Sequence, residues 1–176
     1  MNRKILATVL GAAVVMSAAM ATAQTTKPMG LSVRAGLFWP TSGYGRSIGR
    51  TWFGVGGEYK ISDANFGTMD RGSSGIFSLS VDYYSKGAAS AVPVLFNYVG
   101  MKNEMYYTVG AGIALTRDEE LVGGVMQGRS KANFAYQLGV GYNFQSGTNP
   151  LFVEGRYFGN SNTNLNGFGV YVGIRL

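Results

Sequence analysis

The sequence predicts an all-β protein, an eight-stranded antiparallel transmembrane β-barrel that follows a cleavable signal peptide. Three observations support this prediction. The N-terminal segment has the pattern of an export signal, the rest of the chain divides into short alternating runs, and one face of these runs carries no charge. Charged residues make up 14% of the chain, against about 25% in ordinary soluble domains.

Residues 1–23 have the features of a secretory signal peptide. Arg3 and Lys4 give a basic start, an apolar run extends from Ile5 to Met16, and the small residues 21–23 precede Gln24. The apolar run is shorter than the roughly 20 residues of a spanning helix, which favours a cleaved signal over an uncleaved anchor. We therefore expect residues 24–176 to form the barrel domain.

The remaining chain alternates with a period of two between clusters of Gly, Ser, Asn, Asp and Thr, which is typical of strands and turns. The predicted strands lie near 30–39, 51–61, 75–84, 90–99, 105–115, 132–144, 150–158 and 166–176. Most have about the 9 to 11 residues that a tilted strand needs to cross a bilayer. Long outer loops are expected at 40–50, 85–89, 116–131 and 159–165, and inner turns at 62–74, 100–104 and 145–149.

One parity of these strands is apolar and is predicted to face lipid. If the first strand rises from the periplasm, its aromatic residues gather in two rings. The ring at the outer end comprises Trp39, Phe53, Tyr83, Phe134, Tyr157 and Phe168, and the ring at the inner end comprises Tyr59, Phe77, Tyr98, Tyr107, Tyr142 and Phe144. Two aromatic girdles around an aliphatic band are typical of membrane barrels, because aromatic rings prefer the headgroup level.

The opposite parity is predicted to be small, polar and rich in glycine, as a narrow barrel interior requires. Its charged members are Arg34, Glu58, Lys60, Asp82, Glu154, Arg156 and Arg175, and we expect them to pair as a structural network in the lumen. A soluble barrel would instead carry many charges on its exterior.

Three segments carry a resemblance to a known family: the strand from Tyr107 to Ile113, the segment from Phe152 to Tyr157, and the closing strand from Gly169 to Leu176. With the signal peptide, they resemble the small outer-membrane β-barrel proteins of diderm bacteria, the group of the OmpA transmembrane domain and OmpX-like proteins. The resemblance implies location in the outer membrane. It also implies contact with outer-membrane lipid and lipopolysaccharide, and passage through the barrel-assembly machinery.

The composition bears on the possible chemistry. The chain has no histidine, the commonest general base and a frequent metal ligand, so we expect no enzyme and no catalytic or metal site. Absence of cysteine removes thiolate metal ligands, and scattered basic residues argue against nucleic acid binding. The Gly54–Val55–Gly56 and Gly139–Val140–Gly141 segments lie within strands, so they predict inward glycines and no cofactor loop.

A structural or surface-interaction role, adhesin-like in kind, is the function that these patterns favour. The alternatives are a small channel, disfavoured because eight strands leave a lumen that side chains fill, and a soluble periplasmic ligand-binding barrel. In the loop 116–131, Gly123–Gly124 is a hairpin signal between apolar pairs. The two flanking strands are therefore candidates to continue as a ribbon whose edge meets an extracellular partner.

Overall fold

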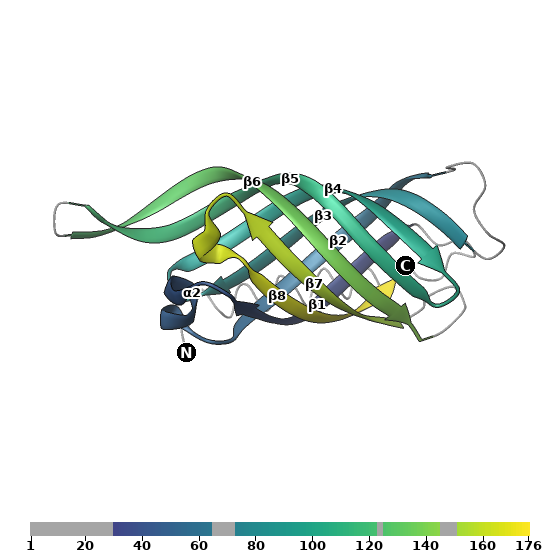
Figure 1. The fold of residues 1–176 in the computed structure, drawn as a ribbon, viewed down its shortest axis with the longest axis horizontal. Helices are drawn as coiled ribbons and strands as arrows, with labels where there is room; N and C mark the ends of the chain where they lie inside the picture. The colour runs from purple at the N-terminus through teal and green to yellow at the C-terminus, as the bar shows by residue number, and fades with distance from the viewer. Residues whose placement is uncertain (1–29, 65–72, 123–124, 145–150) are drawn as a thin grey trace.

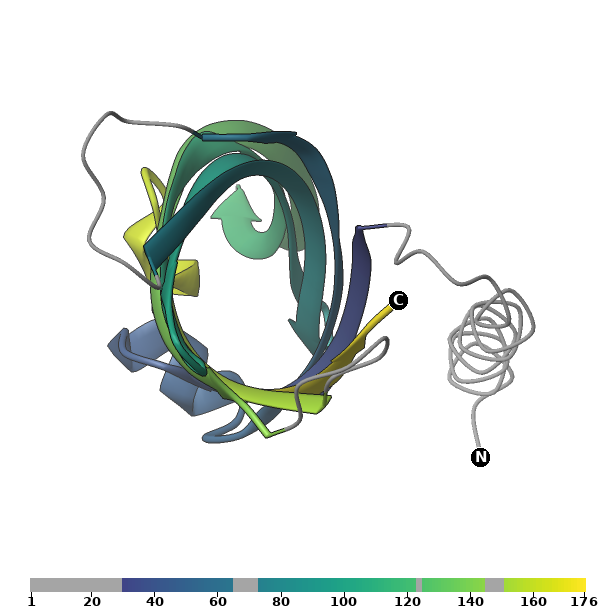
Figure 2. The same ribbon diagram turned by 90° about the vertical axis from the view of Figure 1, so that its right-hand side faces the viewer.

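The computed structural model describes residues 30–64, 73–122, 125–144 and 151–176. These residues form a closed barrel of eight strands in which each strand pairs antiparallel with its neighbours in the chain (Figure 1). β1 and β8 pair from Ser32↔Arg175 to Pro40↔Gly167 and close the ring, which Figure 2 shows nearly end-on. The predicted fold is confirmed. The proposed signal peptide lies outside the described residues.

Several strands extend further than predicted. The prediction followed the alternating apolar residues, and backbone pairing continues beyond them. The bounds of the strands are β1 Leu31–Pro40, β2 Trp52–Asp63, β3 Ser73–Lys86, β4 Ala89–Lys102, β5 Met105–Val122, β6 Val125–Asn143, β7 Leu151–Asn160 and β8 Gly167–Arg175. A register shift between Lys60 and Ser62 marks a bulge in β2. Most of the predicted turn at 62–74 and all of the turn at 145–149 fall outside the described residues.

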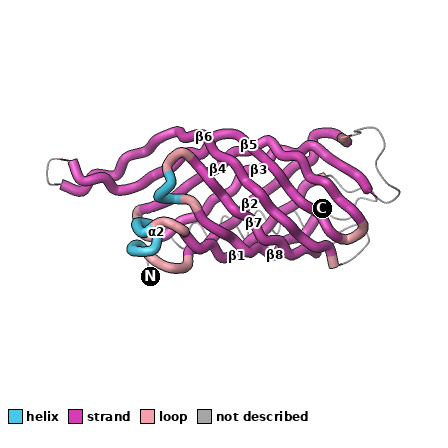
Figure 3. Tube along the Cα trace, viewed as in Figure 1, coloured by secondary structure: helices cyan, strands magenta, loops and turns pink. Residues whose placement is uncertain are grey.

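Two short helices lie at one end of the barrel, which we call the α2 end (Figure 3). They are α2 (Gly43–Ile48) and the 3₁₀ turn η1 (Thr163–Leu165). Ser42 caps α2 by accepting a hydrogen bond from the Gly45 amide, 2.9 Å away, and it donates to the Asn164 carbonyl at 2.5 Å. No helix in the described part of the chain is long and apolar enough to cross a membrane.

β5 and β6 continue beyond the α2 end as a two-stranded ribbon. β5 pairs with β4 as far as Ser90↔Arg117, and β6 pairs with β7 as far as Ala135↔Asn160. Their mutual pairing runs on to Val122↔Val125, and Figure 1 shows the ribbon extending past the other strands. The hairpin signal in the predicted loop 116–131 thus indicated the arrangement correctly, although residues 123–124 themselves are not described.

The opposite end, where β1 begins and β8 finishes, is the terminal end. All twelve girdle residues lie on the outward parity, and the two rings lie toward the two ends as the alternation of strand directions requires. The apolar residues between them are exposed, for example Val172 at 59% and Ile113 at 55%. A contiguous apolar surface of this kind needs lipid as its solvent.

The prediction of a uniformly small and polar lumen is wrong. Seven large apolar side chains are almost fully buried inside the α2 end: Phe38, Trp52, Tyr84, Leu95, Phe158, Leu165 and Tyr171. Several of these rings are in direct contact, and Phe38 stacks on Tyr84 with centroids 4.2 Å apart. The rings of Phe38 and Tyr171 lie against glycines of the facing strands and occupy the space that the missing side chains leave.

The glycines within strands make room for these groups. A Cβ at Gly54 would touch the ring of Tyr171, one at Gly56 would overlap the carboxylate of Asp82, and one at Gly141 would overlap Tyr106. This placement confirms that the two Gly-Val-Gly segments are lumen glycines in strands.

Candidate functional site

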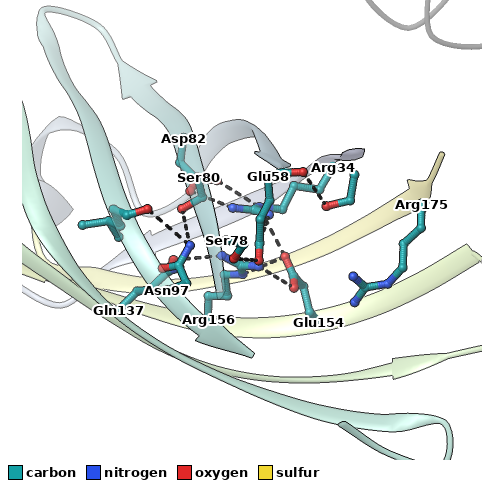
Figure 4. A network of polar contacts seen from close by, with 12 residues as sticks. Arg34, Glu58, Ser78, Ser80, Asp82, Asn97, Gln137, Glu154, Arg156 and Arg175 are labelled. Carbon is teal, nitrogen blue, oxygen red and sulfur yellow. Dashed lines mark hydrogen bonds and ion pairs between the residues drawn. The ribbon is translucent and has the colours of Figure 1, made fainter. Parts of the chain in front are cut away.

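A network of charged and polar side chains fills the middle of the lumen (Figure 4). Its centre is Arg34 on β1, which is almost fully buried. The Arg34 guanidinium lies 2.7 Å from Asp82 Oδ2 through Nη2 and 3.1 Å from Glu58 Oε2 through Nη1. Its Nε donates to Asp82 Oδ1 at 2.9 Å and lies 3.3 Å from Glu154 Oε1. One arginine therefore joins carboxylates from three strands.

Arg156 on β7 is the second centre of the network. Its Nη2 lies 2.7 Å from Glu58 Oε2, and its Nε lies 2.8 Å from Glu154 Oε1. Its Nη1 donates to Gln137 Oε1 at 2.9 Å. Because both arginines contact Glu58 and Glu154, the ion pairs form one connected unit across the barrel.

Neutral side chains continue the network around the wall. Ser78 donates to Glu58 at 2.6 Å, and Tyr106 donates to Glu154 at 2.8 Å. Gln137 donates to Asn97, which donates in turn to Ser80 at 3.0 Å. Nearly every polar group of the central layer thus has a partner, as burial in a low-dielectric interior demands.

Two of the seven predicted network residues lie apart from this unit. Lys60 is close to the end of β2, and its Nζ lies 2.6 Å from Asp63 Oδ1, where both side chains reach solvent. Arg175 lies at the terminal end, with its guanidinium 4.7 Å from the ring centroid of Tyr106 and 5.0 Å from that of Phe152. Parity placed both residues on the correct face, but parity carries no information on depth along the barrel axis.

The lumen is therefore filled in three layers. The aromatic cluster occupies the α2 end, the arginine network occupies the middle, and Val99, Tyr106 and Phe152 pack at the terminal end. Sequence reasoning missed the first and third layers, although Phe38, Trp52, Tyr84 and Tyr171 share the inward parity with the polar residues. Surfaces available for chemistry accordingly lie on the outside of the barrel and at its ends.

The α2 end combines a carboxylate with amide and hydroxyl groups. Asp118, buried on the inward side of β5, accepts a hydrogen bond from Asn162 at 2.7 Å. Asn133 donates to Thr116 at 2.6 Å, and the Asn166 side chain accepts from the backbone amide of Asn160 at 2.7 Å. Ser161 lies beside Asn162 and is exposed.

Comparison with known proteins identifies relatives of this barrel. The sequence model described as Lipid A 3-O-deacylase (PagL) matches residues 27–167. Among curated protein sequences, none matches the chain.

A solved structure shares the fold, and a second gives a weaker match. The N-terminal β-barrel domain of OprF from Pseudomonas aeruginosa superposes with a TM-score of 0.52 at 11% identity, covering 85% of this chain and 100% of that one. The outer membrane protein Ail from Yersinia pestis gives a TM-score of 0.46 at 14% identity, with 83% of this chain and 98% of Ail covered. The chain is an outer-membrane β-barrel, so the alternative of a soluble periplasmic barrel is wrong.

The family match contradicts the expectation that the chain is no enzyme, because the matched family is one of lipid A 3-O-deacylases. That expectation rested on the absence of histidine. Histidine is the commonest general base, but aspartate, glutamate, lysine and tyrosine also serve in this role. Its absence therefore does not remove a chain from an enzyme family.

Proposed function

The chain belongs to the lipid A 3-O-deacylase (PagL) family, and from this membership we propose that it is a surface-interaction barrel whose target is lipid A of the outer leaflet. The observation that carries the proposal is the family match over residues 27–167. Lipid A has acyl chains in the bilayer and a phosphorylated sugar at the headgroup level, so it would lie against the outer wall of a barrel.

The filled lumen supports a role at the outer surface. Its three layers of buried side chains leave the exposed apolar belt, the α2 end and the ribbon as the parts that can meet another molecule. The orientation that we propose places the α2 end outside the cell, because the longer connections of such barrels face outward.

The ribbon supports the adhesin-like part of the proposal. Beyond Ser90↔Arg117 and Ala135↔Asn160, the outer edges of β5 and β6 have no ladder partner among the described strands. An unpaired edge offers backbone donors and acceptors to an extended segment of another protein. An extracellular partner at residues 116–131 is therefore part of the proposed role.

Hydrolysis of lipid A at the 3-O ester is the second candidate function, and the family match favours it. Without imidazole, the reaction would use another base to activate water. Asp118 is a carboxylate at the α2 end, with one oxygen held by Asn162 at 2.7 Å. Its side chain faces into the barrel at the rim of the α2 end, so the ester of lipid A must reach over this rim for Asp118 to act, and on that path Asp118 is our candidate for the base.

One reconstitution experiment tests both functions. The full-length protein is placed in vesicles of phosphatidylethanolamine with trace lipid A or trace phosphatidylglycerol, and lipid retained on the purified protein is quantified by mass spectrometry. Enrichment of lipid A over phosphatidylglycerol supports lipid A as the target, and equal retention would overturn it.

The same spectra report hydrolysis. The second candidate is supported if the wild type removes one 3-O acyl chain from lipid A and Asp118→Asn leaves lipid A intact. The control is Asp63→Asn, at the opposite end of the barrel. Intact lipid A after prolonged incubation with the wild type would remove hydrolysis as the function.

A further inference from the structure

We propose that a row of four outward side chains near the α2 end, Ser85, Ser90, Arg117 and Ser130, binds the phosphorylated sugar of lipid A, with Arg117 on a phosphate. We call it the serine–arginine row. This inference rests on the proposed function and assigns its headgroup contact to particular residues.

Strand register brings the four residues side by side. Ser85 on β3 pairs with Ser90 on β4, Ser90 pairs with Arg117 on β5, and Arg117 pairs with Ser130 on β6. Residues directly opposite in neighbouring antiparallel strands have Cβ atoms about 4.5–5.5 Å apart on the same face. The row is therefore continuous across four strands, although its two end members, Ser85 and Ser130, lie far apart in the sequence.

The row faces lipid and lies one step above the apolar belt. Arg117 has the same parity as Ile113 and Leu115, which are each 55% exposed on the barrel exterior. The next outward row toward the terminal end contains Val92, Leu115 and Ala132, which are paired in the same way. Along β5 the exterior thus changes from apolar at Leu115 to polar at Arg117, which is typical of the level where acyl chains end and headgroups begin.

The chemistry of the row suits a phosphate. The guanidinium of Arg117 presents planar donors that match two phosphate oxygens at once, and the serine hydroxyls add single donors on both sides. Arg117 and Ser130 are exposed, and Ser85 and Ser90 are half-buried. The neighbouring carboxylate of Asp118 lies on the inward face, bonded to Asn162, so it does not compete for the guanidinium from the lipid side.

Lipid A is the occupant that fits both rows together. Its phosphate would contact the serine–arginine row, and its acyl chains would lie along Val92, Leu115 and the belt below. Charge complementarity selects the anionic headgroup, and the adjacent apolar row selects a lipid over a free phosphate ion.

The test uses full-length protein in phosphatidylethanolamine nanodiscs. It compares the affinity of the protein for lipid A with two phosphates and for lipid A without phosphate. Arg117→Gln should weaken binding of the phosphorylated form about tenfold, since loss of a charge-assisted contact of roughly 1.4 kcal/mol or more has that effect. It should leave the dephosphorylated form unchanged. Arg117→Lys keeps the charge without the planar fork and should recover part of the affinity.

Arg50→Gln is the matched control, because Arg50 is an exposed arginine between α2 and β2, outside the row. Heat-modifiable migration in detergent gels verifies that each variant is folded. Arg117→Gln can bind both forms of lipid A as the wild type does while the wild type still prefers lipid A over phosphatidylglycerol. In that case the serine–arginine row is not the headgroup contact, and the proposed function stands. If the wild type shows no such preference, lipid A is overturned as the occupant of the row and the proposed function fails with it.

Discussion

At the scale of single residues, buried ion pairs and glycines decide how the lumen is filled. Arg34 is the clearest case, because three carboxylates lie within 3.3 Å of its nitrogen atoms and none of them reaches bulk water freely. A buried carboxylate left without its cation is strongly unfavourable.

Replacement of Arg34 by glutamine should therefore lower the free energy of unfolding by about 3–5 kcal/mol. Lys60→Gln is the control, because its pair with Asp63 is solvent-exposed and such pairs contribute about 0–1 kcal/mol. Denaturant titration in lipid vesicles, followed by tryptophan fluorescence, measures both. Similar losses for the two variants would show that the network is not a stabilising unit.

Gly56 tests the packing of the same layer. A Cβ there would overlap Asp82 and crowd Arg34, whereas one at Gly155 would meet no atom within 4 Å. Gly56→Ala should cost about 1–3 kcal/mol through overpacking, and Gly155→Ala should be nearly neutral. The same titration measures both variants, and a Gly56→Ala protein as stable as the wild type would contradict the close approach of these side chains.

At the scale of elements, each strand divides its residues between lipid and lumen. Val172 on β8 lies in the lipid-facing band, paired with Ala35 and Val153. Arginine at a lipid-facing position near the midplane costs about 2–4 kcal/mol, falling to about 0–1 kcal/mol near the interfaces.

We accordingly expect Val172→Arg to be destabilised by about 2–4 kcal/mol and Leu151→Arg, at the first residue of β7, by about 1 kcal/mol or less. Equilibrium folding into vesicles gives both values. Insertion of Val172→Arg with wild-type stability would mean that its side chain does not face lipid.

The alternation of residues was sufficient to predict the elements, because a period of two follows directly from strand geometry. Strand ends were harder to predict: β5 and β6 continue through the polar residues 116–118 and 129–131, where backbone pairing persists without an apolar signal. The helix α2 was not predicted at all. Its six residues include two glycines, and a local cap at Ser42 and contacts with η1 stabilise it rather than an amphipathic pattern.

At the scale of the whole molecule, the sequence predicted the closed barrel and its charged interior but not the order of layers along the axis. Trp52 and Tyr171 lie on the same parity as Glu58 and Glu154, so alternation alone cannot separate an aromatic layer from a charged one. The shear of the barrel decides which residues from distant strands share a level. The contacts of Arg34 with Asp82 and Glu154 depend on that shear. The alternation of residues along the sequence does not reveal the shear.

The family also belongs to this scale. Composition led to the expectation that the chain is no enzyme, because the commonest catalytic base is missing, and the family match contradicts it. The match to the lipid A 3-O-deacylase family instead extends over residues 27–167, up to the first residue of β8. The absence of one residue type removes one route to catalysis, whereas the family match rests on most of the chain.

Conductance across a planar bilayer most directly tests the claim that side chains fill the lumen of the barrel and that its function lies on its outer surface. The purified full-length protein should produce no reproducible current steps, because aromatic, charged and apolar layers fill the lumen from end to end. Regular, uniform conductance steps from the wild-type protein would show an open pore and contradict both the filled lumen and the surface role derived from it.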